Sequence, residues 1–212
     1  MIVSAVIAID GPAASGKGTL ARRIAEHFGR PYLDTGLLYR AVARVMLDRG
    51  LPLDDESAAM AVAVELNPAR IEESRLRGAE MGEAASVVSV HAGVRQALLG
   101  LQRRFAAQAG GAVLDGRDIG TVVCPEADVK LFVTATPEER ARRRHRELAA
   151  KGDRIGYDRV LQAIRERDER DSRRSAAPLR AAPDAILLDT TNLDQDAAFA
   201  RALEMILAAR AA

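Results

Sequence analysis

The residues with the clearest chemical meaning form a glycine-rich run that could bind phosphate groups. Gly11, Gly16 and Lys17 stand in the order and spacing of the G-x-x-x-x-G-K pattern. Backbone N–H groups at the start of a helix are fixed donors for anionic oxygens, and glycines let the phosphates approach closely. The lysine adds a positive charge at the β- and γ-phosphates. We therefore predict an ATP site made of Gly11, Pro12, Ala13, Ala14, Ser15, Gly16, Lys17, Gly18 and Thr19.

The sequence on either side of this run supports the same interpretation. Val3 to Ile9 is apolar and rich in β-branched residues, as in a strand buried on both faces. Leu20, Ile24 and Phe28 follow at helical spacing, so the run joins a strand to a helix, which argues against a chance glycine-rich turn. Gly18 stands where a metal-binding hydroxyl usually follows the lysine. We therefore expect Mg²⁺ to enter with ATP and to be held mainly by phosphates and water, with no direct protein ligand assigned. Asp115, at the end of a predicted strand, could orient the ion through water.

Charge is distributed unevenly along the chain, which indicates an anionic ligand. Residues 140–180 contain 14 basic and 7 acidic residues, against 17 and 23 in the remainder. Such a block could bind a nucleic acid or a nucleotide, and the phosphate-binding run favours the nucleotide. Arg167, Asp171 and Arg174 stand at i, i+4 and i+7, so one helical face would carry all three. A solvated helix with ordinary ion pairs would show the same spacing.

Several further motifs resemble those of a known enzyme family. The run Thr35-Gly36-Leu37-Leu38-Tyr39-Arg40 resembles the acceptor-binding element of nucleoside monophosphate kinases. More specific matches are the runs 115–123 (DGRDIGTVV) and 166–171 (ERDERD), with Arg174 and 177–179 (APL) after them. Ser86 and Arg95 also stand nine apart. Together these motifs resemble bacterial cytidylate kinases over nearly the whole chain, which implies transfer of the γ-phosphoryl group of ATP to CMP and dCMP.

The resemblance implies how the acceptor nucleotide would be held. Arg40 and Arg117 would bind the phosphate of CMP, because a forked guanidinium suits two phosphate oxygens. Ser86, Arg95 and Asp118 would contact the cytosine, whose exocyclic amino group can donate to a carboxylate, whereas uracil presents an acceptor there. Each role has an alternative: a surface ion pair for either arginine, a turn cap for Asp118, and a solvated helical serine for Ser86.

The resemblance also implies which residues take part in the transfer. Family members use the face that would carry Arg167, Asp171 and Arg174 for the sugar and the transferring phosphoryl group, and Thr35 belongs to the acceptor-binding element. One or two arginines of the cluster at 140–144 would reach ATP as a lid closes, and we assign Arg143 to this role. The expected catalytic set is Lys17, Arg117, Arg167 and Arg174.

Apolar periodicity distributes these residues over alternating strands and helices. Strands are expected at 3–9, 32–34, 112–114, 129–133 and 185–188. Helices are expected from near residue 17, after 35 up to about 50, at 58–66, 80–90 and 94–107, from 136 with breaks at Gly152 and Gly156, and around 199–207. This alternation predicts an α/β fold of the P-loop kinase type, a parallel sheet of about five strands flanked by helices.

We expect one domain over residues 1–212. Its core would be 1–34, 111–140 and 184–212, with a helical acceptor-binding segment at 35–110 and a mobile lid with basic helices at 141–183. Many members of the family have a longer, β-rich insert between the positions held here by Leu66 and Gly82, where this chain has a short polar stretch. We expect this difference to affect how the acceptor-binding segment closes and to leave the catalytic motifs unchanged.

Composition narrows the class of protein. No apolar run approaches the roughly 18 residues of a membrane span, and the single cysteine, Cys124, has no internal partner. Three histidines show no zinc-ligand spacing. Aromatic residues make up 3% of the chain, too few for a surface that stacks bases. We therefore expect a monomeric cytoplasmic enzyme that binds neither membranes nor nucleic acids. UMP, AMP or shikimate remain alternative acceptors, and a guanine-nucleotide switch lacks its Asn-Lys-x-Asp element.

Overall fold

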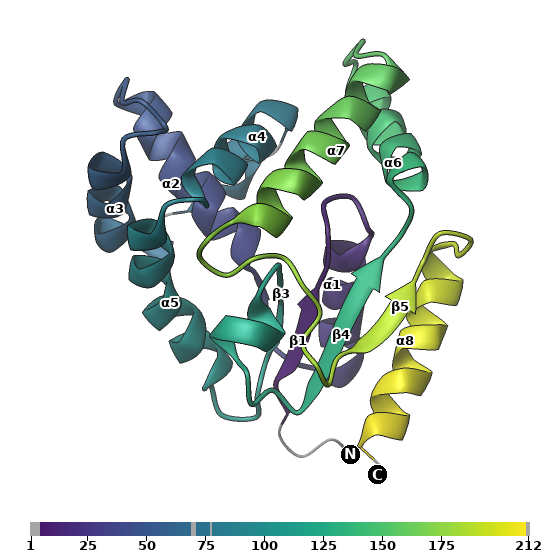
Figure 1. The fold of residues 1–212 in the computed structure, drawn as a ribbon. Coiled ribbons are helices and arrows are strands. Elements are labelled where there is room, and N and C mark those ends of the chain that lie inside the picture. Colours follow the sequence, from purple (N-terminus) through teal and green to yellow (C-terminus); the bar gives the residue numbers. More distant parts are fainter. Residues whose placement is uncertain (1–4, 69–70, 77, 211–212) are drawn as a thin grey trace.

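A five-stranded parallel sheet lies at the centre of the computed structural model, which describes residues 5–68, 71–76 and 78–210 (Figure 1). The strands are β1 (Ile7–Asp10), β2 (Tyr32–Asp34), β3 (Val113–Gly116), β4 (Val129–Thr134) and β5 (Ile186–Asp189). Their order is β2-β3-β1-β4-β5, and every neighbouring pair is parallel. The predicted fold class is confirmed. The first strand begins at Ile7 rather than Val3, and residues 1–4 lie outside the described part of the chain.

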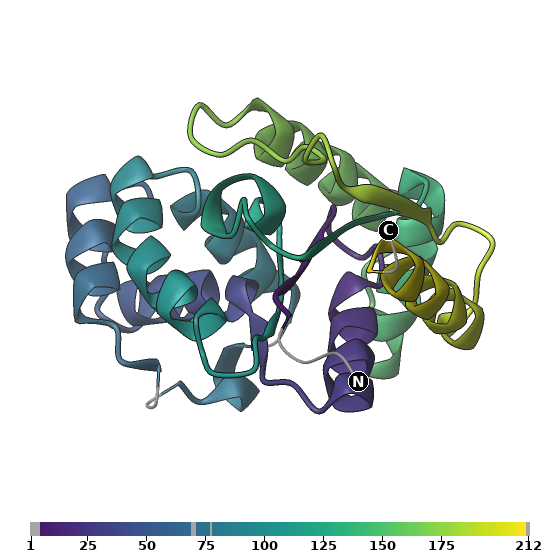
Figure 2. The same ribbon diagram turned by 90° about the horizontal axis from the view of Figure 1, so that it is seen from below.

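Alternating side chains of the central strands fill two separate apolar layers. Ile7 and Ile9 pack against α1 (Lys17–Phe28) and α8 (Gln195–Ala209), whereas Ala8 faces the opposite layer. That second layer contains the end of α5 (Ala92–Ala106) and a single π-helical turn, η3 (Ile119–Val123). Figure 2 shows α1 and α8 on one side of the sheet and α5 on the other. Both faces are therefore covered, as the apolar strands require.

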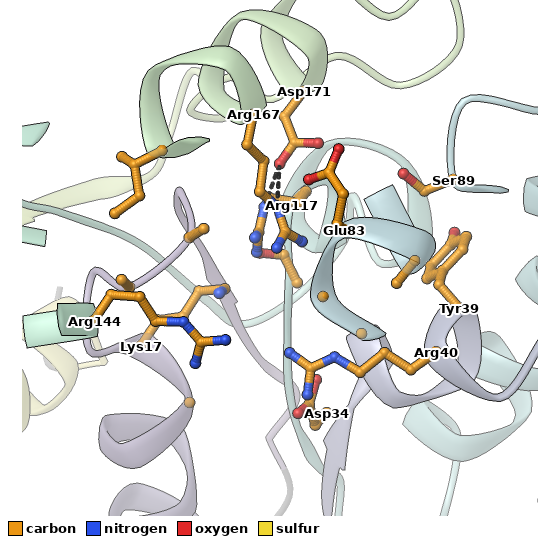
Figure 3. A pocket seen from close by; sticks show the side chains of 18 of the residues that line it. Lys17, Asp34, Tyr39, Arg40, Glu83, Ser89, Arg117, Arg144, Arg167 and Asp171 are labelled. Carbon is orange, nitrogen blue, oxygen red and sulfur yellow. Dashed lines mark hydrogen bonds and ion pairs between the residues drawn. The ribbon is translucent and has the colours of Figure 1, made fainter. Parts of the chain in front are cut away.

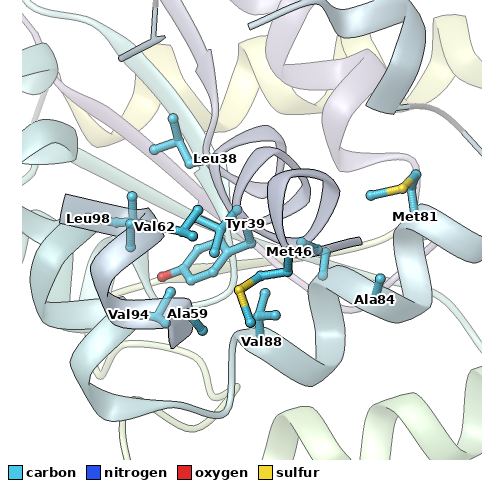
Figure 4. Close-up of a cluster of buried hydrophobic side chains, with 14 residues drawn as sticks. Leu38, Tyr39, Met46, Ala59, Val62, Met81, Ala84, Val88, Val94 and Leu98 are labelled. Atoms are coloured by element: carbon cyan, nitrogen blue, oxygen red, sulfur yellow. The ribbon is translucent and has the colours of Figure 1, made fainter. Parts of the chain in front are cut away.

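The segment between β2 and β3 folds around a core of its own. It contains α2 (Thr35–Asp48), α3 (Glu56–Glu65), a 3₁₀ turn (Glu73–Leu76), α4 (Ala79–Val88) and α5. On α2, Leu38, Val42 and Met46 recur every four residues, so one stripe of that helix is buried. Figure 4 shows this stripe packed against α3, α4 and α5. The short stretch 67–78 that replaces the β-rich insert includes residues 69, 70 and 77, which lie outside the described part.

Two further helices, which follow β4 and precede β5 in the chain, pack above the sheet in the view of Figure 1. These helices are α6 (Pro137–Ala150) and α7 (Tyr157–Arg173), separated near Gly152 and Gly156 as the sequence predicts. Thr136 caps α6 by accepting a hydrogen bond from the Glu139 N–H at 3.3 Å. The expectation of one helical face for Arg167, Asp171 and Arg174 needs a correction. The helix ends at Arg173, and Arg174 follows it in extended geometry.

Close backbone packing fixes the phosphate-binding run to the sheet. A Cβ on Gly11 would lie 2.0 Å from the carbonyl oxygen of Val133 in β4, and the Gly11 φ of 153° favours glycine. Gly29, at the C-cap of α1, also has positive φ (60°), but nothing lies within 4 Å of its Cβ position. Comparing alanine substitutions at the two positions therefore distinguishes the energetic cost of steric overlap from that of backbone strain.

We predict that Gly11→Ala destabilises the protein far more than Gly29→Ala. The second change costs about 1 kcal/mol of backbone strain, and the first should add at least about 2 kcal/mol because backbone atoms must move apart. Urea unfolding followed by circular dichroism would measure both free energies of unfolding. Equal destabilisation would show that the contact with β4 does not constrain the loop.

Candidate active site

A charged cavity of about 590 Å³ opens at the carboxyl ends of β1, β2 and β3. Its lining includes ten basic and six acidic side chains, an excess of positive charge that suits anionic ligands. Figure 3 shows Lys17 and Arg144 on one side of this space and Arg40 on the other, with Arg117 and Arg167 between them. The cavity lies between the phosphate-binding run, the α2–α5 segment and the helix pair α6–α7.

The phosphate-binding run enters α1 as the sequence predicts. Gly16, with φ 87°, is the N-cap of α1, so Lys17 begins the helix. Ala14 also has positive φ, at 58°. A second cavity lies on the other side of this run and is lined in part by Ser15, Gly16 and Arg143. The two cavities share Lys17 and Arg144. Lys17 therefore stands where two bound nucleotides would meet.

Other residues of the predicted ATP site fall into two groups. Ala14, Gly18 and Thr19 line both cavities, and Ala13 lines the first. Gly11 and Pro12 are buried beneath the loop and act on its shape rather than on a ligand surface.

Two arginines of α6 hold the phosphate-binding run in place. Arg143 donates to the carbonyl oxygen of Ser15 at 3.4 Å and to the hydroxyl and carbonyl oxygens of Thr190. Arg140 donates to the carbonyl oxygen of Ala13 at 3.2 Å and forms a bidentate pair with Asp168 of α7. Arg143 lines the second cavity, as expected of an ATP contact. The sequence does not predict the supporting role of Arg140.

The arginines expected at the transferred phosphoryl group gather around one carboxylate. Arg117 Nε donates to Asp171 at 2.9 Å, and Arg167 Nε lies 3.8 Å from the same oxygen. Burial raises the pKa of Asp171, but the guanidinium groups of Arg117, Arg167 and Arg174 outweigh it and leave that pKa below its usual value. Burial and Arg117 lower the pKa of Arg167 to about 10. Asp171 thus partly neutralises a cluster that favours a phosphate.

The residues expected to contact the base form a buried network beside this cluster. Arg95 forms an ion pair with Asp118 and donates to the Ser89 carbonyl oxygen at 3.3 Å. Arg174 Nη1 lies 3.5 Å from the Ser89 hydroxyl. Since the Asp118 side chain makes no cap hydrogen bond at η3, the turn-cap alternative is wrong. Instead the carboxylate lines the cavity and is paired with Arg95.

Ser86 occupies a different environment from the solvated one considered above. Its side chain is 1% exposed on α4, and no hydrogen bond to its Oγ is found among the described residues. A buried hydroxyl without a partner is costly unless a ligand or water completes it. Ser86 does not line the cavity, whereas Ser89, one turn further on, does. The i, i+3 relation of the two serines is the sequence signal that could have indicated Ser89.

Asp10 connects the phosphate-binding run to the acceptor site. Its carboxylate accepts the backbone N–H groups of Ile119 and Gly120 at 2.8 and 2.7 Å, directly after Asp118. Burial raises the pKa of Asp10 to about 7, against the effect of these two donors. The residue precedes Gly11, so one carboxylate links β1 to the turn that carries Asp118. Sequence reasoning missed this role because a strand-terminal aspartate has many uses.

The remaining residues predicted to bind the acceptor line the first cavity. Arg40 and Thr35 lie on α2, and the Thr35 hydroxyl donates to the carbonyl oxygen of Asp115 at 2.8 Å. The side chain of Arg40 extends toward Lys17 and Arg144 (Figure 3). Eight of the nine residues predicted to bind the acceptor line this cavity: Thr35, Arg40, Arg95, Arg117, Asp118, Arg167, Asp171 and Arg174.

Oxygen atoms from the ends of β2 and β3 and from α1 fit a hydrated magnesium ion. The carboxylates of Asp34 and Asp115 and the Thr19 hydroxyl line the cavity beside Lys17. Within residues 5–68, 71–76 and 78–210, no group of three or more acidic, histidine or cysteine residues is close enough to hold a metal alone. This donor set suits an ion that keeps most of its water and phosphate ligands.

Together the fold and the site define the class of protein. A parallel sheet with a phosphate-binding loop after β1, and two adjoining cavities that share the loop lysine, are the features of a P-loop kinase. In the described part of the chain, no single helix meets the length and hydropathy of a membrane span. The pair Glu80–Val88 and Ala92–Ala106 meets them together, with a bend of 101°.

Comparisons with known proteins identify the family. A family profile described as "Cytidylate kinase" matches residues 7–208. A cytidylate kinase of Xanthobacter autotrophicus is 63% identical over 206 residues, 97% of this chain and 99% of that protein. One of Methylocella silvestris is 59% identical and covers 95% and 93% of the two chains. The chain belongs to the cytidylate kinase family.

A solved structure supports the fold independently. An uncharacterised protein from Eubacterium ventriosum superposes with a TM-score of 0.56 at 15% identity, covering 96% of this chain and 98% of that one.

We predict that kcat/KM for ATP falls as pH rises through about 8. Burial and Arg117 lower the pKa of Lys17 to about 8, so the free enzyme loses this positive charge above that pH. The pH profile of kcat/KM for ATP reports the pKa values of groups in the free enzyme. Under saturating MgATP the bound phosphates should keep Lys17 protonated, so kcat should lack this decline. A flat kcat/KM profile up to pH 9.5 would contradict the assignment.

Proposed function

We propose that this chain transfers the γ-phosphoryl group of ATP to CMP and dCMP, giving ADP and the corresponding diphosphate. The observation that carries this proposal is the pair of cavities joined at Lys17, one beside the phosphate-binding loop and the other lined by the Arg95–Asp118 pair. The family membership supports the same reaction.

The reaction needs positioning and charge neutralisation rather than a general base. The attacking oxygen belongs to the acceptor phosphate, which is largely dianionic at pH 7 because its second pKa is about 6. Lys17 and the loop N–H groups would hold the ATP phosphates, and Arg117, Arg167 and Arg174 would neutralise the charge on the two phosphates as they approach. Mg²⁺, oriented by Asp115 through water, would neutralise ATP phosphate charge when bound.

The acceptor would bind with its phosphate toward Lys17 and its base toward α4 and α5. Arg40 and Arg117 would contact the phosphate, and Asp171 and Arg174 the sugar. Asp118 would accept from the cytosine amino group while Arg95 holds its carboxylate in place. The Ser86 hydroxyl is buried one turn from Ser89 and has no hydrogen-bond partner among the described residues, so a bound base or its water would complete it.

Residues 35–110 would move as the acceptor-binding segment and 141–183 as the lid. Each has its own apolar cluster, so each can shift as a unit relative to the sheet. Closure would exclude water and protect ATP from hydrolysis. We further propose a cytoplasmic monomer without nucleic-acid affinity, because a single chain supplies both cavities and few aromatic residues are available for stacking.

A panel of acceptors tests the proposed reaction. We expect rapid ADP release with CMP and dCMP, at least about tenfold slower release with UMP or AMP, and none with shikimate. Lys17→Ala should retain the circular dichroism spectrum and lose transfer, because its charge acts on the phosphates. Equal turnover of AMP and CMP would contradict the acceptor assignment, and an active Lys17→Ala variant would contradict the role of the loop.

The preference for cytosine is expected to depend on Asp118. Asp118→Asn keeps the shape but replaces an acceptor-only carboxylate by an amide that can also donate to uracil. The ratio of kcat/KM for CMP to that for UMP should fall by about tenfold or more. Steady-state kinetics with both acceptors measures this ratio, and Asp184→Asn, whose carboxylate lies outside the cavity, is the matched control. An unchanged ratio would remove Asp118 from base recognition.

A further inference from the structure

Tyr32 has a polar contact that its place in a short edge strand does not require. Its ring packs beside the α1 layer and under the guanidinium of Arg22, 5.2 Å from the ring centre. Its hydroxyl donates to Asp115 Oδ1 at 2.7 Å, and both residues line the cavity. A phenylalanine would serve the packing equally well, so the hydroxyl has a separate effect that is confined to Asp115 and the nearby carbonyl oxygen of Gly18.

The other oxygen of Asp115 faces Lys17. Asp115 Oδ2 lies 3.9 Å from Lys17 Nζ, beyond hydrogen-bond distance. Asp115 is 3% exposed, and Lys17 is the one cation within ion-pair distance of it among the described residues. The carboxylate is thus held on one side by a neutral donor and stands slightly apart from the ammonium group on the other.

The Tyr32 hydroxyl is the donor in this contact, because an ionised carboxylate can only accept hydrogen bonds. The hydrogen bond therefore holds the Asp115 carboxylate in one orientation, with one oxygen on Tyr32 and the other toward Lys17.

We propose that Tyr32 is a positioning residue that restrains Asp115 and thereby keeps the Lys17 ammonium available to nucleotide phosphates. A buried carboxylate that loses its donor must find another, because an unsatisfied charged group is costly in this environment. Lys17 is the nearest cation, so the carboxylate would close onto it. A tighter Lys17–Asp115 pair would then compete with the phosphates of ATP. This inference rests on the proposed role of Lys17 as a phosphate contact.

The test compares Tyr32→Phe with the wild type in ADP binding without metal. Isothermal titration calorimetry at pH 7 in EDTA, where Lys17 is mostly charged and Asp115 mostly ionised, should show ADP affinity weakened by about five- to tenfold, with CMP affinity unchanged. In steady state KM for ATP should rise by a similar factor while KM for CMP at saturating ATP stays constant. Tyr157→Phe is the matched control, since its hydroxyl contacts only the Glu138 carbonyl oxygen at 3.4 Å among the described residues.

A double-mutant cycle separates positioning from simple packing. In the Asp115→Asn background the competing charge is absent, so Tyr32→Phe should no longer weaken ADP binding. Asp115→Asn alone should bind metal-free ADP at least as tightly as the wild type. Thermal melting of each variant verifies folding at the assay temperature, and the Asp115→Asn result stands even if Tyr32→Phe proves unstable.

The outcomes distinguish failure of the inference from failure of the proposed site. If Lys17→Ala weakens ADP binding but Tyr32→Phe leaves both ADP affinity and KM for ATP unchanged, the positioning role is overturned. Weaker ADP binding by Asp115→Asn, or an equal loss from Tyr32→Phe in both backgrounds, would overturn it as well. If Lys17→Ala binds ADP like the wild type, the assignment of the phosphate loop itself fails.

Discussion

Repulsion between positive charges is the constraint on which this structure depends. A site that brings two polyanionic nucleotides together must concentrate cations, and the cavity gathers Lys17, Arg40, Arg117, Arg167 and Arg174 within one space. Burial, and then the neighbouring guanidinium group of Arg117, lower the pKa values of Lys17 and Arg167, so desolvation and repulsion both oppose their positive charges. Buried carboxylates relieve that repulsion. Asp171 partly neutralises the arginine cluster, Asp118 pairs with Arg95, and Asp115 stands near Lys17.

The sheet determines where these charges can meet. Parallel strands bring their carboxyl ends to one edge, so Asp34 pairs with Asp115 across β2 and β3, and Asp10 ends β1 beside Gly116. The same edge starts the phosphate-binding loop and the turn that carries Arg117. Side chains on the flanking layers are apolar and leave this edge as the polar end of the core. The position of the site follows from the order of the strands in the sheet. It also depends on the alternation of successive side chains between the two faces of the sheet.

Much of this arrangement could be predicted from sequence because it depends on local patterns. The loop at 11–19 and its strand–helix context predicted the fold, and the loop lines the two cavities that meet at Lys17. Motifs at 35–40, 115–123 and 166–174 predicted which residues line the acceptor side, through resemblance to a family. What could not be predicted are contacts between distant segments. Asp10 with the N–H groups at 119 and 120, Tyr32 with Asp115, and Arg140 with the loop depend on register and crossing geometry, which no spacing rule encodes.

The misplaced details follow from the same distinction. Helical spacing placed Arg174 on one face with Arg167, yet the chain leaves the helix after Arg173 and returns through a hydrogen bond from Leu179 N–H to the Asp171 carbonyl oxygen at 2.8 Å. Arg174 then reaches Ser89 and Ala177 from an extended segment. An arginine outside the helix can turn toward α4 more freely than one on a fixed helical face. Sequence periodicity thus identified the residue but not the end of the helix, because periodicity places the ends of helices less precisely than their interiors.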